Sequence, residues 1–210
     1  MNAKNNIEKS PAIVFDYGGV LMDWNPHYLF DPLMGNDPEA VDSFLREINF
    51  FEWNERFDEG RPYSEGTADL ISKYPQYAHL IRAYDEQYTK TVRGCNQPVV
   101  DILASLKHLG YPLFGLSNWS IEKFSEVRKG YPFFDLFDDM VISGIEKCIK
   151  PGPAIFNILL DRAGRPAGAC LFIDDNRANI EAAAGLGFQT IHFRSAEQLR
   201  DELAARNILD

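Results

Sequence analysis

Polar or acidic side chains follow three short apolar runs of the sequence. Asp16 ends the run AIVFD, and Ser117 ends the run PLFGLS with Asn118 directly after it. Asp174 and Asp175 follow the apolar residues of a third run, ACLFI. Burying a carboxylate is costly unless another group satisfies it. Because ligands of open parallel sheets bind beyond the carboxyl ends of the strands, these five side chains predict a site at that edge.

The acidic residues of this set predict a cation site. Asp16, Asp174 and Asp175 would repel one another in a single crevice unless a divalent cation lay among them, and hard oxygen ligands suit Mg²⁺. Gly18 stands two residues after Asp16, and a residue without a side chain can bring its backbone carbonyl close to a metal. Asp16 alone would favour a helix or turn cap, but the acidic pair after another strand weakens that interpretation.

Ser117, Asn118 and Lys150 predict a site for an anion. A serine hydroxyl and the neighbouring backbone N–H groups together can bind a phosphate oxygen, although an ordinary turn after a strand has the same residues. Lys150 precedes Pro151-Gly152-Pro153, and the two prolines fix the chain just before a helix. A lysine is usually a solvated surface group, but rigid placement at a helix entrance suits a cation directed at an anion.

Short apolar runs that alternate with helical patterns predict an α/β fold with a Rossmann-like parallel sheet. Two more expected strands lie at residues 140–144 and 188–193. Glycines stand where the expected helices end, which is typical of helix C-termini. Those helices cover residues 99–109, 153–163, 177–186 and 196–206.

The first two expected strands are separated by residues 22–111, which is too long a connection for one crossover helix. An inserted α-helical cap subdomain is therefore expected at residues 26–93. Its helical patterns lie at 38–48, 64–71 and 77–92. The remaining residues would form the core (11–25 and 94–210) and a flexible N-terminal arm (1–10).

Composition bounds the class of protein. The 210 residues, 45% hydrophobic and 13% aromatic, suffice for one domain that carries a smaller insertion. A net charge of −10 without a cluster of Lys and Arg argues against a nucleic-acid partner. Three widely spaced cysteines predict neither a disulfide nor a zinc site.

The start of the sequence lacks the apolar core of a signal peptide, and no run of residues could span a bilayer. We therefore expect a cytoplasmic protein without a membrane partner.

The order of these motifs resembles that of the haloacid dehalogenase-like (HAD) hydrolase superfamily. Its four motifs are matched by DYGGVL at 16–21, LSN at 116–118, KPGPAIF at 150–156 and FIDDN at 172–176. The similarity extends from residue 12 to about residue 193, and the insertion is similar to the helical cap of the first cap class. The resemblance implies a hydrolase with a Rossmann-like core.

The resemblance also implies catalytic roles. Asp16 would be the nucleophile, Ser117 and Asn118 would bind the transferring phosphoryl group, and Lys150 would orient the nucleophile and neutralise charge. A carboxylate nucleophile forms an aspartyl-phosphate, which splits hydrolysis into two displacements. The metal and the lysine offset charge on the equatorial oxygens.

Metal ligands follow from the same resemblance. Asp16, the Gly18 carbonyl and Asp175 would bind Mg²⁺ directly, and Asp174 would act partly through water. Gly18 departs from the family pattern, because most phosphatases of the superfamily carry a second aspartate there as general acid and base. Such help is typically worth about 10²–10⁴ in rate, so its absence should slow esters with poor leaving groups.

The DxGGV or DxGNV form of the first motif resembles a bacterial subgroup near the sugar-phosphate (glucose-1-phosphate-type) phosphatases. An anomeric phosphate leaves more easily than an alkyl phosphate, which makes a missing acid less damaging. We therefore expect a Mg²⁺-dependent phosphatase acting on a small phosphorylated metabolite, with sugar phosphates favoured. The protein would act as a monomer or a weak homo-oligomer.

Two alternative functions stay open. A 2-haloacid dehalogenase would use Asp16 to displace halide from carbon without a metal, although such enzymes usually carry Tyr at the position of Gly18. A non-catalytic binding protein on the same scaffold is supported by Gly18 alone. Substrate selection would fall to the cap, where Trp24, Trp53, Asn54 and Arg56 are candidates, but cap core and solvated charge explain these residues equally well.

Overall fold

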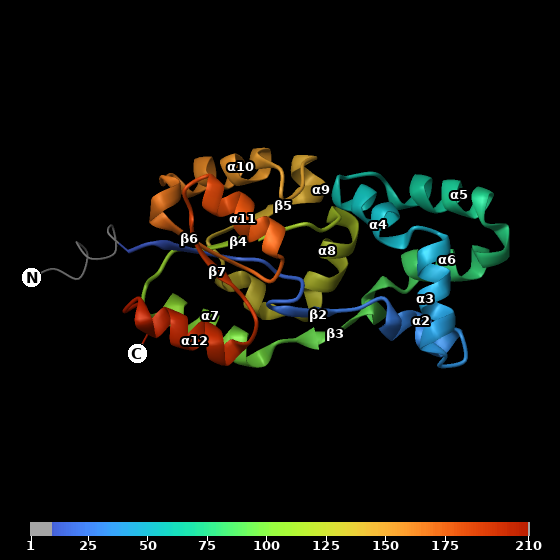
Figure 1. Ribbon diagram of the computed structural model, residues 1–210, viewed down its shortest axis with the longest axis horizontal. Coiled ribbons are helices and arrows are strands. Elements are labelled where there is room, and N and C mark those ends of the chain that lie inside the picture. Colours follow the sequence, from blue (N-terminus) through green and yellow to red (C-terminus); the bar gives the residue numbers. More distant parts are fainter. Residues whose placement is uncertain (1–9, 210) are drawn as a thin grey trace, which may run out of the picture.

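The computed structural model describes residues 10–209. Its centre is a five-stranded sheet of order β5-β4-β1-β6-β7, in which all neighbouring strands are parallel (Figure 1). The strands are β1 (Ala12–Phe15), β4 (Leu113–Ser117), β5 (Asp139–Ile142), β6 (Cys170–Asp174) and β7 (Gln189–His192). The expected α/β fold is confirmed, and each of the five apolar runs overlaps one of its strands, although β5 begins one residue before the run at 140–144 and ends two residues before the end of that run.

β1 lies in the middle of the sheet, between β4 and β6. The chain passes from β1 to β4 and β5 on one side, and later to β6 and β7 on the other. The register pairs Phe15 with Gly115 of β4 and with Ile173 of β6, so the residues that end or follow these three strands meet at one edge. A reversal of strand order of this kind is where open α/β sheets bind ligands.

Two layers of helices cover the sheet because successive strand residues face opposite sides. Val14 packs with residues of α10 (Pro153–Ala163) and α11 (Arg177–Gly185). Ile13 packs on the opposite face, in a cluster that includes residues of α7 (Gln97–His108), α8 (Ile121–Val127) and α12 (Ala196–Ala205). The short α9 (Ser143–Glu146) follows β5. Short 3₁₀ turns cover Pro75–Tyr77, Tyr88–Thr91, Arg128–Gly130, Pro132–Leu136 and Ala167–Ala169.

A separate helical body lies beside the sheet (Figure 1). It follows β2 (Met22–Trp24) and precedes β3 (Val92–Cys95), which pair as an antiparallel ribbon between the two bodies. Its helices are α2 (His27–Leu33), α3 (Pro38–Glu47), α4 (Phe50–Asp58), α5 (Tyr63–Lys73) and α6 (Ala78–Glu86). This body is the expected cap. Its proposed boundaries at residues 26 and 93 stay a prediction.

Aromatic packing holds the cap together. Three pairs of rings meet edge to face with centroids 4.9–6.0 Å apart: Phe30 with Phe44, Phe30 with Phe50, and Phe50 with Tyr84. Such contacts add about 0.5–1.5 kcal/mol per pair to the burial of the rings. The aromatic residues of the insertion therefore serve mainly as the core of the cap.

Helix predictions agree best in the core. The pattern at 153–163 matches α10 in full, and 99–109, 177–186 and 196–206 match α7, α11 and α12 to within two residues at each end. In the cap, the pattern at 77–92 overestimates α6, which ends at Glu86 before a 3₁₀ turn and β3. α2, α4 and α8 were not expected.

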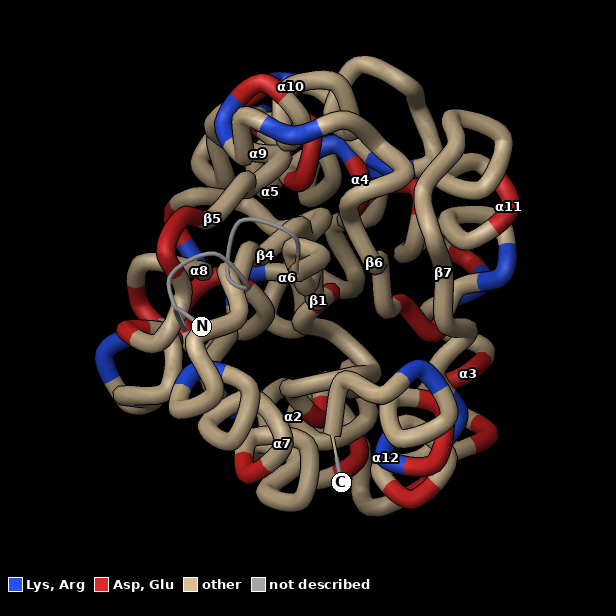
Figure 2. The backbone as a smooth tube through the Cα atoms, turned by 90° about the vertical axis from the view of Figure 1, so that its left-hand side faces the viewer, with Lys and Arg blue, Asp and Glu red and all other residues tan. Residues whose placement is uncertain are grey.

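Charge is dispersed over the described residues. Figure 2 shows basic and acidic positions interspersed along α10, α11 and α12. Cys95, Cys148 and Cys170 form no disulfide. Across residues 10–209, no helix has the length and apolar character needed to cross a membrane. The predicted N-terminal arm lies outside the described residues apart from Ser10, whose carbonyl accepts a hydrogen bond from Arg165 Nη1 at 2.5 Å.

Candidate active site

Asp16 follows β1 at the centre of the sheet edge. Its backbone N–H continues the sheet by donating to the Ile173 carbonyl of β6 at 2.9 Å. Its Oδ1 accepts from the Tyr17 backbone N–H at 2.7 Å and lies 2.9 Å from Lys150 Nζ. The residue is only 8% exposed. Backbone register and two donors therefore fix the orientation of this carboxylate.

Lys150 is buried, and its ammonium group has three oxygen neighbours. Nζ lies 2.9 Å from Asp16 Oδ1 and donates to Asp174 Oδ2 at 2.7 Å and to the Leu116 carbonyl at 2.9 Å. Burial lowers the pKa of Lys150, but Asp16 and Asp174 outweigh that effect and raise the pKa above its usual value. The lysine is therefore a fixed positive charge between the two aspartates.

Asn118 holds the backbone that carries Lys150. Its side-chain Nδ2 donates to the Lys150 carbonyl at 3.0 Å, and its Oδ1 accepts from the Lys150 N–H at 2.8 Å. This pair of bonds ties the end of β4 to the segment before α10. The expected contact between Asn118 and substrate stays a prediction, whereas its role in positioning Lys150 is visible.

Asp174 and Asp175 are held very differently. Asp174 is fully buried and accepts from Lys150 Nζ, from the Asn176 N–H at 2.7 Å, and from Asn179 Nδ2 at 3.0 and 3.2 Å. Asp175 is exposed. Burial of part of its carboxyl group and the charge of Asp174 raise the pKa of Asp175. Asp174 is thus a buried hydrogen-bond acceptor, whereas the carboxylate of Asp175 stays accessible to solvent.

Gly19 makes room for Asp175. It has a φ of +72°, and a Cβ at this position would lie 2.2 Å from Asp175 Oδ2. Both facts favour glycine, because a side chain here would strain the backbone and would force the Asp175 carboxylate to move. Gly18 is less constrained, since its φ is not positive and a Cβ there would meet no atom within 4 Å. Of the two glycines in the first motif, Gly19 is therefore the one that backbone conformation and neighbouring atoms favour.

Asp16, Asp174 and Asp175 fit a divalent cation. Each offers an oxygen, and these oxygens lie within 4.8 Å of one another. Burial raises the pKa of Asp16 to about 7, Lys150 opposes that rise, and Asp174 adds to it. One lysine therefore leaves negative charge uncompensated in this cluster. A donor set made only of oxygen atoms suits Mg²⁺.

A cavity of about 120 Å³ opens beside this cluster. Its core wall includes Gly18 and Ser117, and its cap wall includes Asn54 and Asp58. Trp24, Tyr88, Asn118 and Trp119 complete the lining. A larger cavity of about 440 Å³ lies near α2, α3 and α4, and none of its lining residues ends or follows a strand of the five-stranded sheet. The smaller cavity is lined by Gly18, which closely follows Asp16, and by Ser117 at the end of β4, so it is the cavity next to the clustered carboxylates.

The residues proposed for substrate selection separate into two groups. Trp24 and Asn54 line the 120 Å³ cavity. Trp53 instead lies in the interior of the cap, where its Nε1 donates to the Gly66 carbonyl at 3.0 Å. Arg56 is exposed and pairs with Glu59 at 3.0 Å. Trp53 is therefore part of the cap core and Arg56 is a solvated charge, which are the alternative roles that the sequence also allowed.

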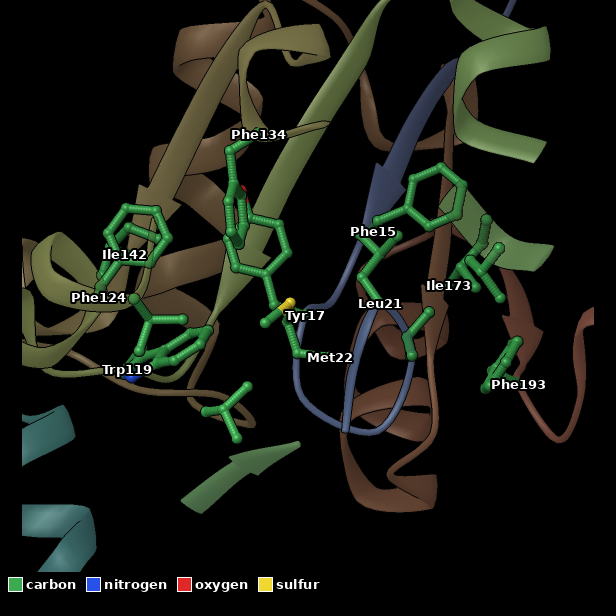
Figure 3. Close-up of a cluster of buried hydrophobic side chains, with 14 of the residues drawn as sticks. Phe15, Tyr17, Leu21, Met22, Trp119, Phe124, Phe134, Ile142, Ile173 and Phe193 are labelled. Carbon is green, nitrogen blue, oxygen red and sulfur yellow. The ribbon is translucent and has the colours of Figure 1, made fainter. Parts of the chain in front are cut away.

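Tyr17, the neighbour of Asp16, points away from the cavity. Figure 3 shows its ring within the buried cluster, close to Phe124 and Phe134. A Cβ on Gly115 would lie 1.7 Å from the Tyr17 hydroxyl, so the ring occupies space that this glycine vacates. Burial raises the pKa of Tyr17 well above its usual value. Tyr17 is a core residue and cannot reach a leaving group.

The sequence match identifies the family. A family model described as haloacid dehalogenase-like hydrolase matches residues 11–187. The chain therefore belongs to the haloacid dehalogenase-like hydrolases and is a hydrolase.

Relatives within the family include more than one activity. The sesquiterpene phosphatase astK of Aspergillus oryzae is 26% identical over 187 residues, which cover 86% of this chain and 88% of that protein. The (S)-2-haloacid dehalogenase 4A of Burkholderia cepacia is 23% identical over 198 residues, covering 88% and 83%. The relatives of this chain therefore include a phosphatase and a dehalogenase.

A similar fold occurs in a solved HAD family enzyme from Bacteroides thetaiotaomicron, in a complex with magnesium and inorganic phosphate. The TM-score is 0.68 at 22% identity, covering 89% of this chain and 95% of that one. This likeness supports the α/β core with a helical insertion.

Proposed function

We propose that this hydrolase is a Mg²⁺-dependent phosphatase in which Asp16 attacks phosphorus. The proposal is carried by the oxygen atoms of Asp16, Asp174 and Asp175, which lie within 4.8 Å of one another. Displacement of halide from carbon does not need such a cation site, whereas a transferring phosphoryl group spreads charge over oxygens that a cation neutralises. The similarity to a phosphatase and to an enzyme that binds magnesium and phosphate supports the same reaction.

Mg²⁺ bound by Asp16, the Gly18 carbonyl and Asp175, and partly through water by Asp174, would neutralise phosphoryl charge and favour ionised Asp16. Tyr17 N–H and Lys150 hold one oxygen of Asp16 and so orient the carboxylate for attack. The Ser117 hydroxyl would bind a phosphoryl oxygen.

The two displacements follow from this arrangement. In the first, a bond forms between an Asp16 oxygen and phosphorus while the bond to the leaving oxygen breaks. In the second, water attacks the phosphorus, and the bond to Asp16 breaks as phosphate is released. Lys150 keeps its positive charge throughout, because two neighbouring carboxylates raise its pKa.

The cavity favours a small ester. Its volume of about 120 Å³ is well below the roughly 300–1,000 Å³ of pockets that enclose drug-sized ligands. A sesquiterpene chain would not fit without movement of the cap. The indole rings of Trp24 and Trp119 and the amide of Asn54 offer an apolar face and a polar group, a combination that suits a sugar phosphate.

The test is a panel of phosphorylated metabolites and p-nitrophenyl phosphate, assayed with Mg²⁺ and with EDTA. We expect Mg²⁺-dependent phosphate release, with small sugar phosphates among the better substrates. In parallel, 2-chloropropionate is assayed with EDTA. Halide release without any phosphate ester cleaved would establish the dehalogenase alternative, and the absence of both activities would favour a binding protein.

A further inference from the structure

Asp58 stands on the opposite wall of the cavity from the core residues. It is the last residue of α4 and lines the cavity together with Gly18 and Ser117. Figure 1 shows the end of the cap that carries α4 beside α8 and α9 of the core. Asp58 is half-buried: protein encloses part of it, and part faces the cavity. A cap carboxyl group therefore shares the cavity with Gly18 and Ser117 of the core.

Contacts between cap and core hold this carboxyl group in place. A hydrogen bond from the Ser120 backbone N–H, in the segment after Asn118, reaches the Asp58 carboxyl. Two residues further along the cap, the Gly60 carbonyl accepts from Lys147 Nζ at 2.9 Å. The Tyr63 N–H donates to Glu122 Oε1 at 3.1 Å. The segment from the end of α4 to the start of α5 is thus attached to the core at the start of α8 and at the end of α9.

The surroundings of Asp58 favour its neutral form. Burial raises its pKa to about 8; the Ser120 N–H opposes this rise, while the charges of Glu55, Asp16 and Glu59 add to it. The phenols of Tyr63, Tyr84 and Tyr88 also lie near enough to sense its charge. The nearby cation Lys123 is engaged by Asp85 at 2.6 Å. A carboxyl group in this setting carries a proton at neutral pH.

The direction of attack places the leaving group near Asp58. In phosphoryl transfer the attacking and leaving oxygens lie roughly in line. If Asp16 attacks from the sheet edge, the leaving oxygen points away from it, toward the cavity between Gly18 and the cap. Three other proton donors near the cavity are less suited: Lys150 donates to neighbouring oxygens, Tyr17 points into the core, and burial raises the pKa of the Tyr88 phenol well above its usual value.

We propose that Asp58, supplied by the cap, is the general acid and base of this enzyme and does the work that Gly18 cannot. As Asp16 attacks and the P–O bond to the leaving group breaks, the Asp58 proton moves to the leaving oxygen and the alcohol departs. The Asp58 carboxylate then takes a proton from the water that attacks phosphorus, and the bond to Asp16 breaks. This inference rests on the proposed phosphatase function.

The experiment compares the parent with Asp58→Asn, using aryl phosphates graded by the pKa of the phenol and a sugar phosphate cleaved by the parent. For poor leaving groups we expect kcat/KM of the variant to fall by about 10²–10⁴, and for the best leaving group by less than about threefold. Glu65→Gln, an exposed carboxylate on α5 that does not act on Asp58, is the matched control. It should leave the dependence on the leaving group unchanged.

Two further readouts separate acid catalysis from a structural role. Because the acid must be protonated, kcat/KM of the parent on a poor leaving group should fall as the pH rises through about 8, and Asp58→Asn should lack this decline. Gly18→Asp in the Asp58→Asn background should restore part of the rate on poor leaving groups, since a Cβ at position 18 meets no atom within 4 Å.

The outcomes distinguish the two proposals. In one outcome, the parent requires Mg²⁺ and Asp16 while Asp58→Asn lowers kcat/KM equally for all phosphate esters, or for none of them. That result would overturn the role of Asp58 but not the proposed phosphatase function. A parent that cleaves no phosphate ester, or an Asp16→Asn variant as active as the parent, would overturn the phosphatase itself.

Discussion

The two walls of the cavity are built by different means. On the core side, sheet register brings Ser117, which lines the cavity, to the same sheet edge as Asp16 and Asp174, and the hydrogen bonds of buried Lys150 connect three strand ends. On the cap wall, Asp58 comes from a helix that reaches the core through a few contacts. Sheet register and hydrogen bonds within the core fix the first wall, whereas the position of the second depends on how two bodies dock. Variants of the two walls should therefore fail in different ways.

The largest expected effect is on the core wall. Asp16→Asn removes the nucleophile while keeping the shape of the side chain, and we expect kcat to fall by at least about 10³-fold for every ester, whatever its leaving group. Steady-state rates with p-nitrophenyl phosphate and with a poor leaving group measure this. A decrease in kcat confined to esters with poor leaving groups would contradict the assignment of Asp16 as the nucleophile, because that pattern is expected of the general acid Asp58.

Metal binding should also depend on the core wall. Asp175→Ala removes the most accessible of the three clustered carboxylates, and we expect Mg²⁺ affinity to fall by at least about 10²-fold. Calorimetric titration with MgCl₂ measures it. Asp201→Ala, an exposed carboxylate on α12, is the control. Equal affinities in the two variants would exclude the proposed cation site.

Docking of the cap should depend on Lys123. Its Nζ lies in the core, donates to Asp85 of the cap at 2.6 Å, and sits 4.5 Å from the centre of the Tyr63 ring. Lys123→Met keeps the apolar stem but leaves Asp85 without this cation, which should cost about 1–2 kcal/mol of unfolding free energy because Asp85 is partly exposed. Urea denaturation measures the change. Lys129→Met, on the exposed turn after α8, should cost less than about 0.5 kcal/mol.

The smallest expected effect concerns the turn after Asp58. Lys147→Ala removes the exposed hydrogen bond to the Gly60 carbonyl. We expect unfolding free energy to change by less than about 0.5 kcal/mol. The rate on poor leaving groups should drop by less than about tenfold and the rate on good ones should not change, because the general acid would be held less firmly. A uniform drop would indicate that this contact does not act through Asp58.

The core was predictable because its strands are apolar and end in polar residues. Periodicity located β1, β4 and β6, and the rule for strand ends then selected Asp16, Ser117 and Asp174. Gly18 drew attention as a possible carbonyl ligand, but the glycine that the geometry favours is Gly19. That preference comes partly from the Asp175 carboxylate, which is adjacent only in the folded chain.

The cap was harder to predict because its signals are weak and its partners are distant. α4 follows Asn49, which has a φ of +51° and makes no side-chain cap hydrogen bond, and α2 contains Pro32. In the sequence, Asp58 resembles its neighbours Glu55 and Glu59. Only the docking of α4 against the core shows which of these carboxyl groups faces the cavity.

The central claim is that Asp16 carries the phosphoryl group. We would mix the enzyme with Mg²⁺ and its best phosphate ester, quench with acid, and reduce with borohydride, which converts an aspartyl-phosphate to homoserine. Peptide mass spectrometry then identifies which residue has been converted to homoserine. The account predicts homoserine at position 16, dependent on both Mg²⁺ and substrate, with none in the Asp16→Asn variant. An enzyme that turns over the ester while position 16 stays unmodified and another carboxylate is reduced would contradict it.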